Sequence, residues 1–193
     1  SGSADYYQPL HEVIQDLNND FLNLGFAPVM IAAAGNSNTD ILNYPSSFDE
    51  VISVAATDIN DRKCMWGLNG SNFHESVDIC APGGKNTDFA NTSGIWSTLP
   101  MNDSFILHAY LNSGYDQLNG TSMAAPHVSG VAALLIGANS SMSSTEVKQR
   151  IIGSSDNHYD VNQAYFGQLG SGRLNAYRAL YQTPVPNLSL QSY

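Results

Sequence analysis

The chain has 193 residues, with 7 Lys+Arg against 17 Asp+Glu and a formal net charge of −10 at pH 7. This length suits one domain with a real hydrophobic core, and a hydrophobic share of 42% is ordinary for a globular protein. The acidic balance argues against nucleic acid or anionic membrane as a partner, because both need basic surface. Low charge (12%) with abundant Asn, Ser, Gly and Tyr favours a secreted or cell-surface protein. No apolar run approaches the length expected of a transmembrane span, and the first residues do not form a signal peptide.

The first half of the chain alternates helical and extended patterns. A run at helical spacing, with Pro9 suited to the first turn and Gly25 to the stop, predicts a helix over about residues 9–24. The apolar residues of that face are Leu10, Val13, Ile14, Leu17, Phe21 and Leu24. Continuous apolar runs at 28–34 and 51–56 are typical of buried parallel strands. Shorter strands are expected at 77–80 and 95–99.

The second half begins with a polar, Tyr-rich loop over about residues 100–118 that has no clear period. A long small-residue helix is expected from Thr121 to Ala138, and a shorter amphipathic helix begins near Ser144, with Ser144 or Thr145 as its cap. A last helical piece covers 175–181. The alternation of helix and strand predicts an α/β fold with a largely parallel sheet. We expect one domain over residues 1–183 and an extended tail over 184–193.

The two cysteines, Cys64 and Cys80, are close enough in sequence for one bridge. In an oxidising compartment we favour a disulfide between them, and the alternative is a pair of buried free thiols. Two cysteines alone do not predict a metal site.

Ser122 is the first candidate for chemistry. It stands at the expected start of the small-residue helix, where its backbone N–H lies in the positive end of the helix and can bind an oxyanion. A serine hydroxyl is a weak nucleophile and needs a base, usually a histidine oriented by a carboxylate. An isolated Gly-Thr-Ser at a helix start is more often a cap, so the longer string around Ser122 carries the argument.

Asn36 is the second candidate. It follows a run of small residues at the end of an expected buried strand, and open α/β sheets place ligands at the carboxyl ends of their strands. A carboxamide there can donate to an oxyanion. The alternative is a loop asparagine that only turns the chain.

Both strings resemble the subtilisin-like serine proteases, the subtilases. The nucleophile string matches almost residue for residue, and the string before Asn36 resembles the oxyanion-hole segment of that family. Further matches cover most of residues 29–180. The strings are Asn119-Gly120-Thr121-Ser122-Met123-Ala124-Ala125-Pro126-His127, Ala32-Ala33-Ala34-Gly35-Asn36, Asn43-Tyr44-Pro45 with Val51-Ile52-Ser53-Val54, Asp78-Ile79-Cys80-Ala81-Pro82-Gly83, Ser97-Thr98-Leu99-Pro100 and Gly170-Ser171-Gly172-Arg173-Leu174-Asn175.

The resemblance implies a subtilisin-like three-layer sandwich, of which this chain is the C-terminal portion of the catalytic domain. It implies Ser122 as nucleophile and Asn36 in the oxyanion hole, with Met123 beside the nucleophile open to oxidative inactivation. It also implies a substrate-binding set whose small, neutral side chains suit an apolar or uncharged residue: Ala33, Ala34, Gly35, Ser37, Asn43 and Thr121.

The resemblance extends to a weak cation site of some members, over Ser46 to Val51 with Asp78. One acidic ligand is too little to predict a metal there. We therefore expect no cofactor and no metal on this chain, although structural calcium is conceivable in an intact enzyme.

The sequence departs from the family at the other two triad positions. The family carries them in a D-(S/T)-G string and an H-G-T-H string, and neither occurs here. The histidines are His11, His74, His108, His127 and His158. His127 lies inside the nucleophile motif, where the resemblance implies a structural role, and none of the others sits in a motif of a general base.

Two explanations compete for this departure. In the favoured one, the chain is part of a serine endopeptidase whose catalytic Asp and His come from an N-terminal segment docked on the open edge of the sheet. In the other, the chain is an inactive relative that binds peptide or protein without cutting it. An α/β-hydrolase esterase is excluded, because its nucleophile elbow requires G-x-S-x-G.

Overall fold

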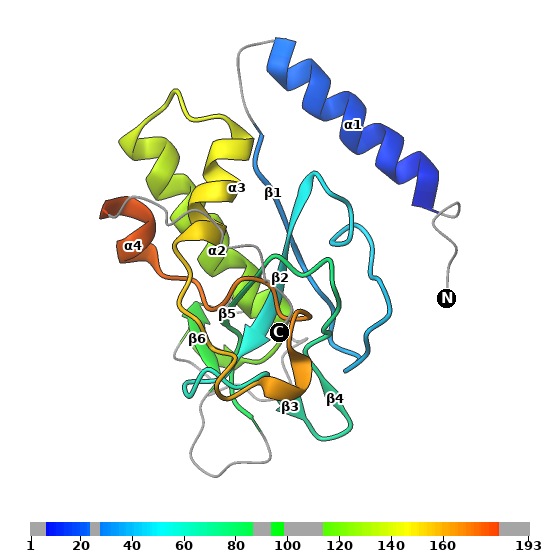
Figure 1. Ribbon diagram of the computed structural model, residues 1–193, viewed down its shortest axis with the longest axis vertical. Coiled ribbons are helices and arrows are strands. Elements are labelled where there is room, and N and C mark those ends of the chain that lie inside the picture. The colour runs from blue at the N-terminus through cyan, green and yellow to red at the C-terminus, as the bar shows by residue number, and fades with distance from the viewer. Residues whose placement is uncertain (1–6, 24–27, 87–93, 99–113, 182–193) are drawn as a thin grey trace, which may run out of the picture.

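The computed structural model describes residues 7–23, 28–86, 94–98 and 114–181 (Figure 1). Its central sheet consists of three parallel strands: β1 (Met30–Ala33), β2 (Val51–Thr57) and β5 (Ile79–Pro82), in the order β1-β2-β5. The register pairs Met30 with Val51 and Val54 with Ile79. Every residue of β2 is buried, as expected for the middle strand of a sheet covered on both faces. The α/β class with a parallel sheet is thereby confirmed.

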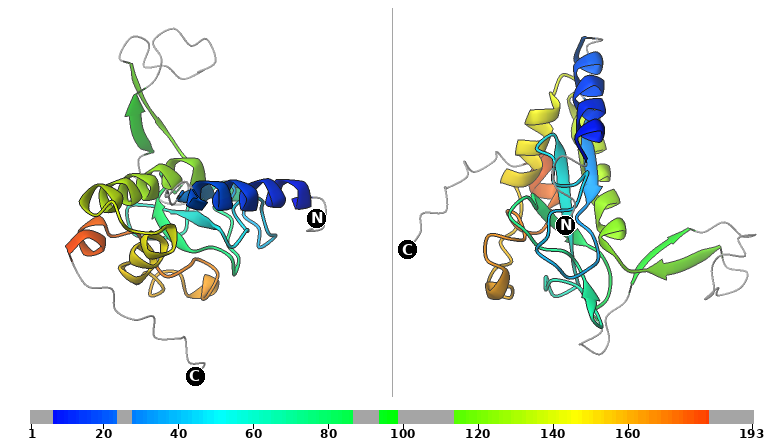
Figure 2. Two further views of the ribbon diagram at one scale, coloured as in Figure 1. Left: turned by 90° about the horizontal axis from the view of Figure 1, so that it is seen from above. Right: turned by 90° about the vertical axis from the view of Figure 1, so that its right-hand side faces the viewer.

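Helices cover this sheet on both sides. Helix α2 (Thr121–Ala138) crosses it with a buried row of small and branched side chains, Ala124, Val128, Val131, Ala132 and Leu135. The views in Figure 2 place α1 (Gln8–Asn23) and α2 on one side of β2, and α3 (Ser144–Gly153) on the other. The chain then runs through a 3-10 turn, Gln163–Tyr165, to α4 (Ala176–Tyr181).

The N-cap of α3 differs from the prediction. Ser143, not Ser144 or Thr145, caps the helix: its hydroxyl accepts from the Glu146 N–H at 3.2 Å, and its own N–H donates to the Glu146 carboxylate at 2.7 Å. This reciprocal capping box satisfies two donors at once. The expected strand at 77–80 is also displaced, since the Val77 N–H is used in a turn to the His74 carbonyl.

Two antiparallel hairpins complete the described residues. Strands β3 (Met65–Trp66) and β4 (Asn69–Gly70) form a small one. Strands β6 (Ile95–Thr98) and β7 (Tyr115–Leu118) pair from Ile95–Leu118 to Thr98–Tyr115 and project away from the sheet (Figure 2). The predicted loop over 100–118 was therefore wrong for its last four residues, while residues 99–113 and the predicted tail at 184–193 lie outside the described residues.

Helix α1 occupies nearly the predicted residues, but its apolar face is uncovered. Ile14 is buried, at 8% exposure, against Phe48 and Val51. The other described members of the stripe are 41–53% exposed: Leu10, Val13, Leu17 and Phe21. Strand β1, which has a partner on one side, is only half-buried along its length. The α1 stripe and the free edge of β1 together form an apolar margin of the described fold.

Helix α2 corrects the expectation that no apolar run is long enough for a membrane span. By length and composition it is the one helix in the described residues that could cross a bilayer. The core helix of a globular domain passes the same test, and α2 packs its buried face on β1, β2 and β5. We therefore interpret it as a core helix.

The favoured disulfide was wrong. Cys64 and Cys80 are both free and fully buried. Their thiols donate to different carbonyls: Cys64 Sγ to Gly84 O at 3.5 Å, and Cys80 Sγ to Leu169 O at 3.3 Å. Burial raises the pKa of Cys64 to about 12 and also raises that of Cys80. Both behave as small core residues with satisfied donors.

A charged cluster ties the C-terminal elements together. The Asp156 carboxylate contacts Arg173 at 2.8 Å and Arg178 at 3.0 Å, and Asn175 Nδ2 donates to it at 2.8 Å. Burial alone would raise the pKa of Asp156, but the hydrogen bonds from Asn175 and Arg178 and the two positive charges lower it. A carboxyl whose folded pKa is lowered stabilises the fold above its unfolded pKa, and that contribution disappears as pH falls through the folded value.

We expect Asp156→Asn to lower the free energy of unfolding at neutral pH by about 2 kcal/mol, because Arg178 loses its ion pair with Asp156 and Arg173 keeps only its pair with Asp61, at 2.9 Å. Urea denaturation at about pH 7 and about pH 3 measures the effect, which should shrink at the lower pH as the wild-type carboxyl protonates. The control is Asp160→Asn, an exposed aspartate four residues away that should change stability by less than about 0.5 kcal/mol. Equal losses in both variants would contradict this account.

Candidate active site

Asn36 and Thr121 join the carboxyl end of β1 to the start of α2. The Asn36 side-chain oxygen accepts two hydrogen bonds from Thr121, from its N–H at 2.9 Å and from its hydroxyl at 3.0 Å. The same hydroxyl accepts the Gly35 N–H at 3.2 Å. The carboxamide oxygen is thus fully used, and Asn36 Nδ2 has no hydrogen-bond partner among the described residues. The arrangement leaves one amide donor available at the end of the strand.

Ser122 follows directly as the second residue of α2, and it is exposed while Thr121 is fully buried. Its N–H belongs to the first turn of the helix, whose amides have no intrahelical acceptor. Gly120 makes this turn with φ 150° and donates to Gly83 O at 2.8 Å. The Ser122 hydroxyl therefore lies at the N-terminus of α2, directly after Thr121, which bonds Asn36.

The described histidines do not contact Ser122. His127 Nδ1 bonds the Met123 carbonyl oxygen at 2.9 Å, within the same helix. His11 pairs with Glu50 at 3.0 Å and stacks on Phe48. His74 and His158 are buried, and burial lowers the pKa of each. The described residues thus bring no general base into contact with the candidate nucleophile, and His108 lies outside them.

The predicted substrate-binding residues gather around Asn72. Asn72 Nδ2 donates to the Ala34 carbonyl at 3.0 Å, and its Oδ1 accepts the Ser37 N–H at 2.9 Å. A Cβ at Gly35 would clash with Asn72 Nδ2 and lie 3.3 Å from Asn43 Nδ2, and φ is 107°, so the backbone here requires glycine. Ala34 is fully buried, so it offers no accessible side-chain surface. Ala33 is half-buried as the last residue of β1.

Sequence reasoning missed Asn72, which is 4% exposed and organises the whole segment after β1. Its own N–H donates to the Gly35 carbonyl at 2.9 Å, in addition to the side-chain bonds. No motif marks it, because its partners are backbone groups more than thirty residues away.

Two cavities border the candidate residues. One, of about 490 Å³, is lined by Asn36, Trp66, Gly67, Asn69, Lys85 and Asn119. The other, of about 320 Å³, lies between the β6–β7 hairpin and α2, and Ser122, Met123 and His127 are among its lining residues. The candidate nucleophile and the candidate oxyanion donor therefore both face accessible space.

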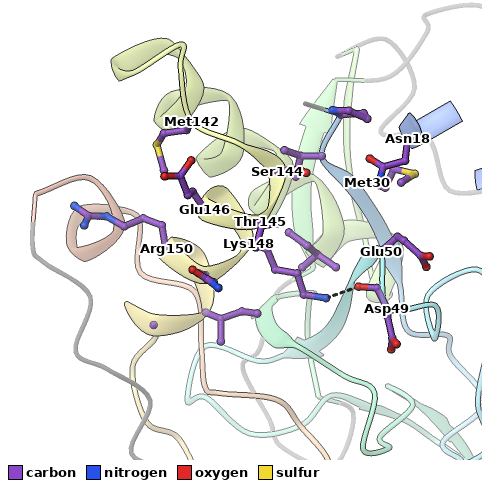
Figure 3. Close-up of a pocket in the computed structure, with 16 residues that line it drawn as sticks. Asn18, Met30, Asp49, Glu50, Met142, Ser144, Thr145, Glu146, Lys148 and Arg150 are labelled. Atoms are coloured by element: carbon purple, nitrogen blue, oxygen red, sulfur yellow. Dashed lines mark hydrogen bonds between the residues drawn. The ribbon is translucent and has the colours of Figure 1, made fainter. Parts of the chain in front are cut away.

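A larger cavity of about 940 Å³ lies elsewhere. Figure 3 shows it between α1, the start of β1 and α3, with Asn18, Met30 and Thr145 among the residues around it. It opens at the amino end of β1, whereas parallel sheets bind ligands at the carboxyl ends of their strands. We therefore do not place the chemistry there.

The segment that resembled a cation site already holds a cation of the protein itself. Lys148 Nζ lies 3.1 Å from Asp78 Oδ1 and donates to the Val51 carbonyl at 3.2 Å. It also donates to the Asp49 carbonyl at 3.1 Å (Figure 3). Burial raises the pKa of Asp78, against the Ser53 N–H bond and Lys148. A further metal ion does not fit these ligands while the ammonium occupies them. Elsewhere in the described residues, no three or more His, Cys, Asp or Glu side chains gather to hold a metal.

Comparison with known proteins identifies the family. The model of the subtilase family, the S8 peptidases, matches residues 3–172. The chain belongs to the subtilase family. Thermitase from Thermoactinomyces vulgaris is 36% identical over 152 residues, which are 79% of this chain and 44% of thermitase. Alkaline elastase YaB from Bacillus sp. (strain YaB) is 32% identical over 148 residues, or 77% of this chain and 32% of the elastase.

Another curated relative and two solved structures are similar to the chain. Subtilisin DY from Bacillus licheniformis is 32% identical over 144 residues, covering 72% of this chain and 43% of the subtilisin. Among solved structures, a protease from Pseudoalteromonas arctica PAMC 21717 superimposes with a TM-score of 0.62 at 30% identity, over 80% of this chain and 42% of that one. A lanthipeptide protease shares the fold, with a TM-score of 0.62 over 79% of this chain and 50% of that one. The chain spans less than half the length of these three curated relatives.

The position of Lys148 leads to a metal prediction. Lys148→Ala should lower the free energy of unfolding by about 2 kcal/mol, because it strands a largely buried carboxylate beside two carbonyl oxygens. We expect calcium to raise the melting temperature of this variant and a chelator to reverse the gain, while Lys148→Arg and the wild type respond to neither. An equal rise with calcium in the wild type would show that the ammonium does not fill the site.

Proposed function

We propose that this chain is the C-terminal portion of a serine endopeptidase that hydrolyses peptide bonds. Ser122 acts as nucleophile, and Asn36 Nδ2 and the Ser122 N–H bind the oxyanion. The single observation that carries this proposal is the pairing of Asn36 Oδ1 with Thr121, because it directs an unused amide donor toward the start of the helix that bears Ser122. Membership of the subtilase family supports it.

In this mechanism the Ser122 hydroxyl attacks the scissile carbonyl while a histidine takes its proton. The carbonyl oxygen becomes an oxyanion between the two donors, and the histidine returns the proton to the leaving amine as the C–N bond breaks. Water then repeats the sequence on the acyl-enzyme. The histidine and its orienting aspartate come from an N-terminal segment that carries D-(S/T)-G and H-G-T-H.

The apolar margin is the surface that we assign to this segment. The free edge of β1 offers unpaired backbone groups to a further parallel strand. The exposed α1 stripe, above all Val13 and Leu17, offers side-chain area that a free-standing domain would bury. A partner that covers both also reaches the carboxyl end of β1, where Asn36 lies.

For the substrate, the small neutral residues around Asn72 favour an uncharged side chain on the acyl side of the scissile bond. Ala33, Gly35, Ser37 and Asn43 would line its pocket, with the buried Ala34 and Thr121 behind them. The reaction requires no cofactor, and any structural calcium of a longer protein would bind away from the Lys148 site. The few charged residues, 12%, favour action outside the cell or at its surface.

The second candidate function is a binding module without catalysis. The observation that favours it is the absence of a histidine in contact with Ser122 among the described residues. The two functions differ in the reactivity of the Ser122 hydroxyl, because only a serine with a base reacts fast with a fluorophosphonate.

Denaturing mass spectrometry of the purified protein after fluorophosphonate treatment tests the enzyme directly. We expect the probe's mass on this chain, located at Ser122, and no label on Ser122→Ala. Asn36→Asp keeps the oxygen that accepts from Thr121 but loses the amide donor. It should lower kcat by about 10²–10³, the factor known from loss of one such donor in a subtilisin, with little change in KM.

Thr121→Ser keeps the hydroxyl and serves as the matched control for Asn36→Asp, with near-normal activity expected. A protein that contains the complete triad strings and leaves Ser122 unlabelled would refute the endopeptidase and favour the binding module.

The same mass spectrum tests the docking surface. A second polypeptide, or a longer form of this one, should carry D-(S/T)-G and H-G-T-H. If it is a separate polypeptide, Leu17→Lys should abolish its co-purification, since a lysine charge would be buried at the interface. Asn19→Lys places the same charge on an exposed position outside the stripe and should leave co-purification intact. Co-purification that survives Leu17→Lys would exclude α1 from the interface.

A further inference from the structure

Lys63 is an unusual residue in this fold because it is only 3% exposed and has no carboxylate partner in the described part of the chain. Buried lysines are rare unless they are paired, since removing an ammonium from water is costly. It lies just before the buried Cys64, in a bridge to Thr57 at the end of β2. Something other than an ion pair must therefore compensate its charge.

Dipoles and aromatic rings provide this compensation. Lys63 Nζ donates to Asn38 Oδ1 at 2.6 Å and to the Ser71 carbonyl at 3.1 Å. It also lies 5.0 Å from the Phe73 ring centroid and 4.8 Å from that of Tyr165. The quadrupole of each ring attracts a desolvated cation that lies over its face. These contacts offset part of the cost of burying the ammonium.

The backbone of Lys63 is fixed independently of its side chain. Its N–H donates to Asn162 Oδ1 at 2.9 Å, and its carbonyl accepts Asn86 Nδ2 at 3.2 Å. The ammonium is consequently held at the end of a side chain whose backbone is fixed. Its hydrogen bonds therefore restrain Asn38 and Ser71.

The shortest of these bonds reaches the loop that carries the candidate oxyanion donor. Asn38 lies two residues after Asn36 and has a left-handed backbone, with φ 51°. Its N–H donates to Gly70 O at 3.0 Å, and the Gly70 N–H donates back to Asn36 O at 3.3 Å. Lys63 bonds both sides of this pairing, through Asn38 in one segment and Ser71 in the other.

We propose that Lys63 is a positioning residue: its ammonium clamps Asn38 to Ser71 and thereby holds the Asn36 backbone where the carboxamide can meet an oxyanion. The clamp itself rests on contacts within this chain, and only its catalytic consequence rests on the function proposed above. Thr121 then fixes the side chain of Asn36, and Lys63 fixes the loop in which Asn36 lies.

The clamp makes the loop sensitive to pH. Burial lowers the pKa of Lys63 to about 8, and only ionised Cys64 and Cys80 would oppose this shift. Those thiols stay protonated in this range because burial raises their own pKa values. The remaining groups at the ammonium are Asn38, Ser71, Met65, Phe73 and Tyr165. As pH rises through about 8 the cation–π attraction disappears, and the bond to Asn38 weakens from charge-assisted to neutral.

Global stability should move in the opposite direction. The folded pKa of Lys63 lies below the unfolded value of about 10.4, so the unfolded chain binds more protons between these two values. Stability therefore rises with pH across this window even as the loop loosens. A residue that only stabilised the fold would move activity and stability together.

Nuclear magnetic resonance of the isolated chain tests the clamp without any need for activity. We expect the side-chain amide signals of Asn36 and Asn38 to titrate with a midpoint near pH 8, and this titration to vanish in Lys63→Met and Lys63→Arg. Lys85→Met removes an exposed lysine that borders Asn36 and should leave the midpoint unchanged. A wild type without this titration, or Lys63→Met that retains it, would overturn the proposal.

The catalytic consequence is measured in the protein that contains its N-terminal segment. Wild-type kcat should fall about tenfold above pH 8 with little change in KM, which is the effect of weakening one charge-assisted hydrogen bond. Lys63→Arg, whose charge does not titrate, should remove the inflection.

Asn38→Gly tests the clamp with Lys63 in place, so it remains informative if Lys63→Met does not fold. Glycine tolerates φ 51° and removes only the acceptor. Its kcat should be low at every pH and free of the inflection, and a wild-type profile would overturn the clamp. An amide titration in a complete protein whose Ser122 never reacts with fluorophosphonate would refute the endopeptidase but support the clamp.

Discussion

The double hydrogen bond from Thr121 to the Asn36 carboxamide oxygen is the interaction on which the rest of the candidate site depends. It fixes the side-chain amide in one orientation, since rotation of the carboxamide would break two bonds and bring NH₂ against two donors. It also joins the end of a parallel strand to the first turn of a helix, so that two donors of different origin, one side-chain amide and one helix N–H, belong to one rigid unit. Preorganised donors of this kind stabilise developing charge without moving.

The two margins of the sheet have opposite characters. At the carboxyl end of β1, Asn72 satisfies the Ser37 N–H and Lys63 bonds the Asn38 side chain, and both residues are almost fully buried. On α1 an apolar stripe is exposed, and β1 has no second strand partner among the described residues. A segment that docks on the apolar margin would meet a carboxyl end of β1 whose hydrogen bonds are already formed. Asn36 and the start of α2 would therefore keep their geometry before the segment arrives.

The sequence predicted the elements whose signals are local. Continuous apolar runs predicted β1 and β2, and small-residue spacing predicted α2, because burial on both faces of a parallel sheet leaves that pattern in a single segment. Long-range features were missed. Residues 115–118 become a strand only by pairing with 95–98, and Ser143 is chosen over two neighbouring hydroxyl residues by the reach of Glu146. The disulfide failed because sequence spacing carries no information on where each thiol finds its acceptor.

The two buried or half-buried lysines show how an acidic chain places its few cations. Lys148 pairs with a carboxylate and two carbonyls, so its charge is balanced locally. In the described residues Lys63 has only dipoles and ring faces around its ammonium, so desolvation prevails and lowers its pKa to about 8. A methionine would fill the same space without the electrostatic cost. A buried lysine is therefore best explained if its charge stabilises the neighbouring loop, and that loop carries Asn36. The proton on Lys63 thus lowers the free energy of unfolding and, in the clamp proposed above, holds the loop that carries Asn36.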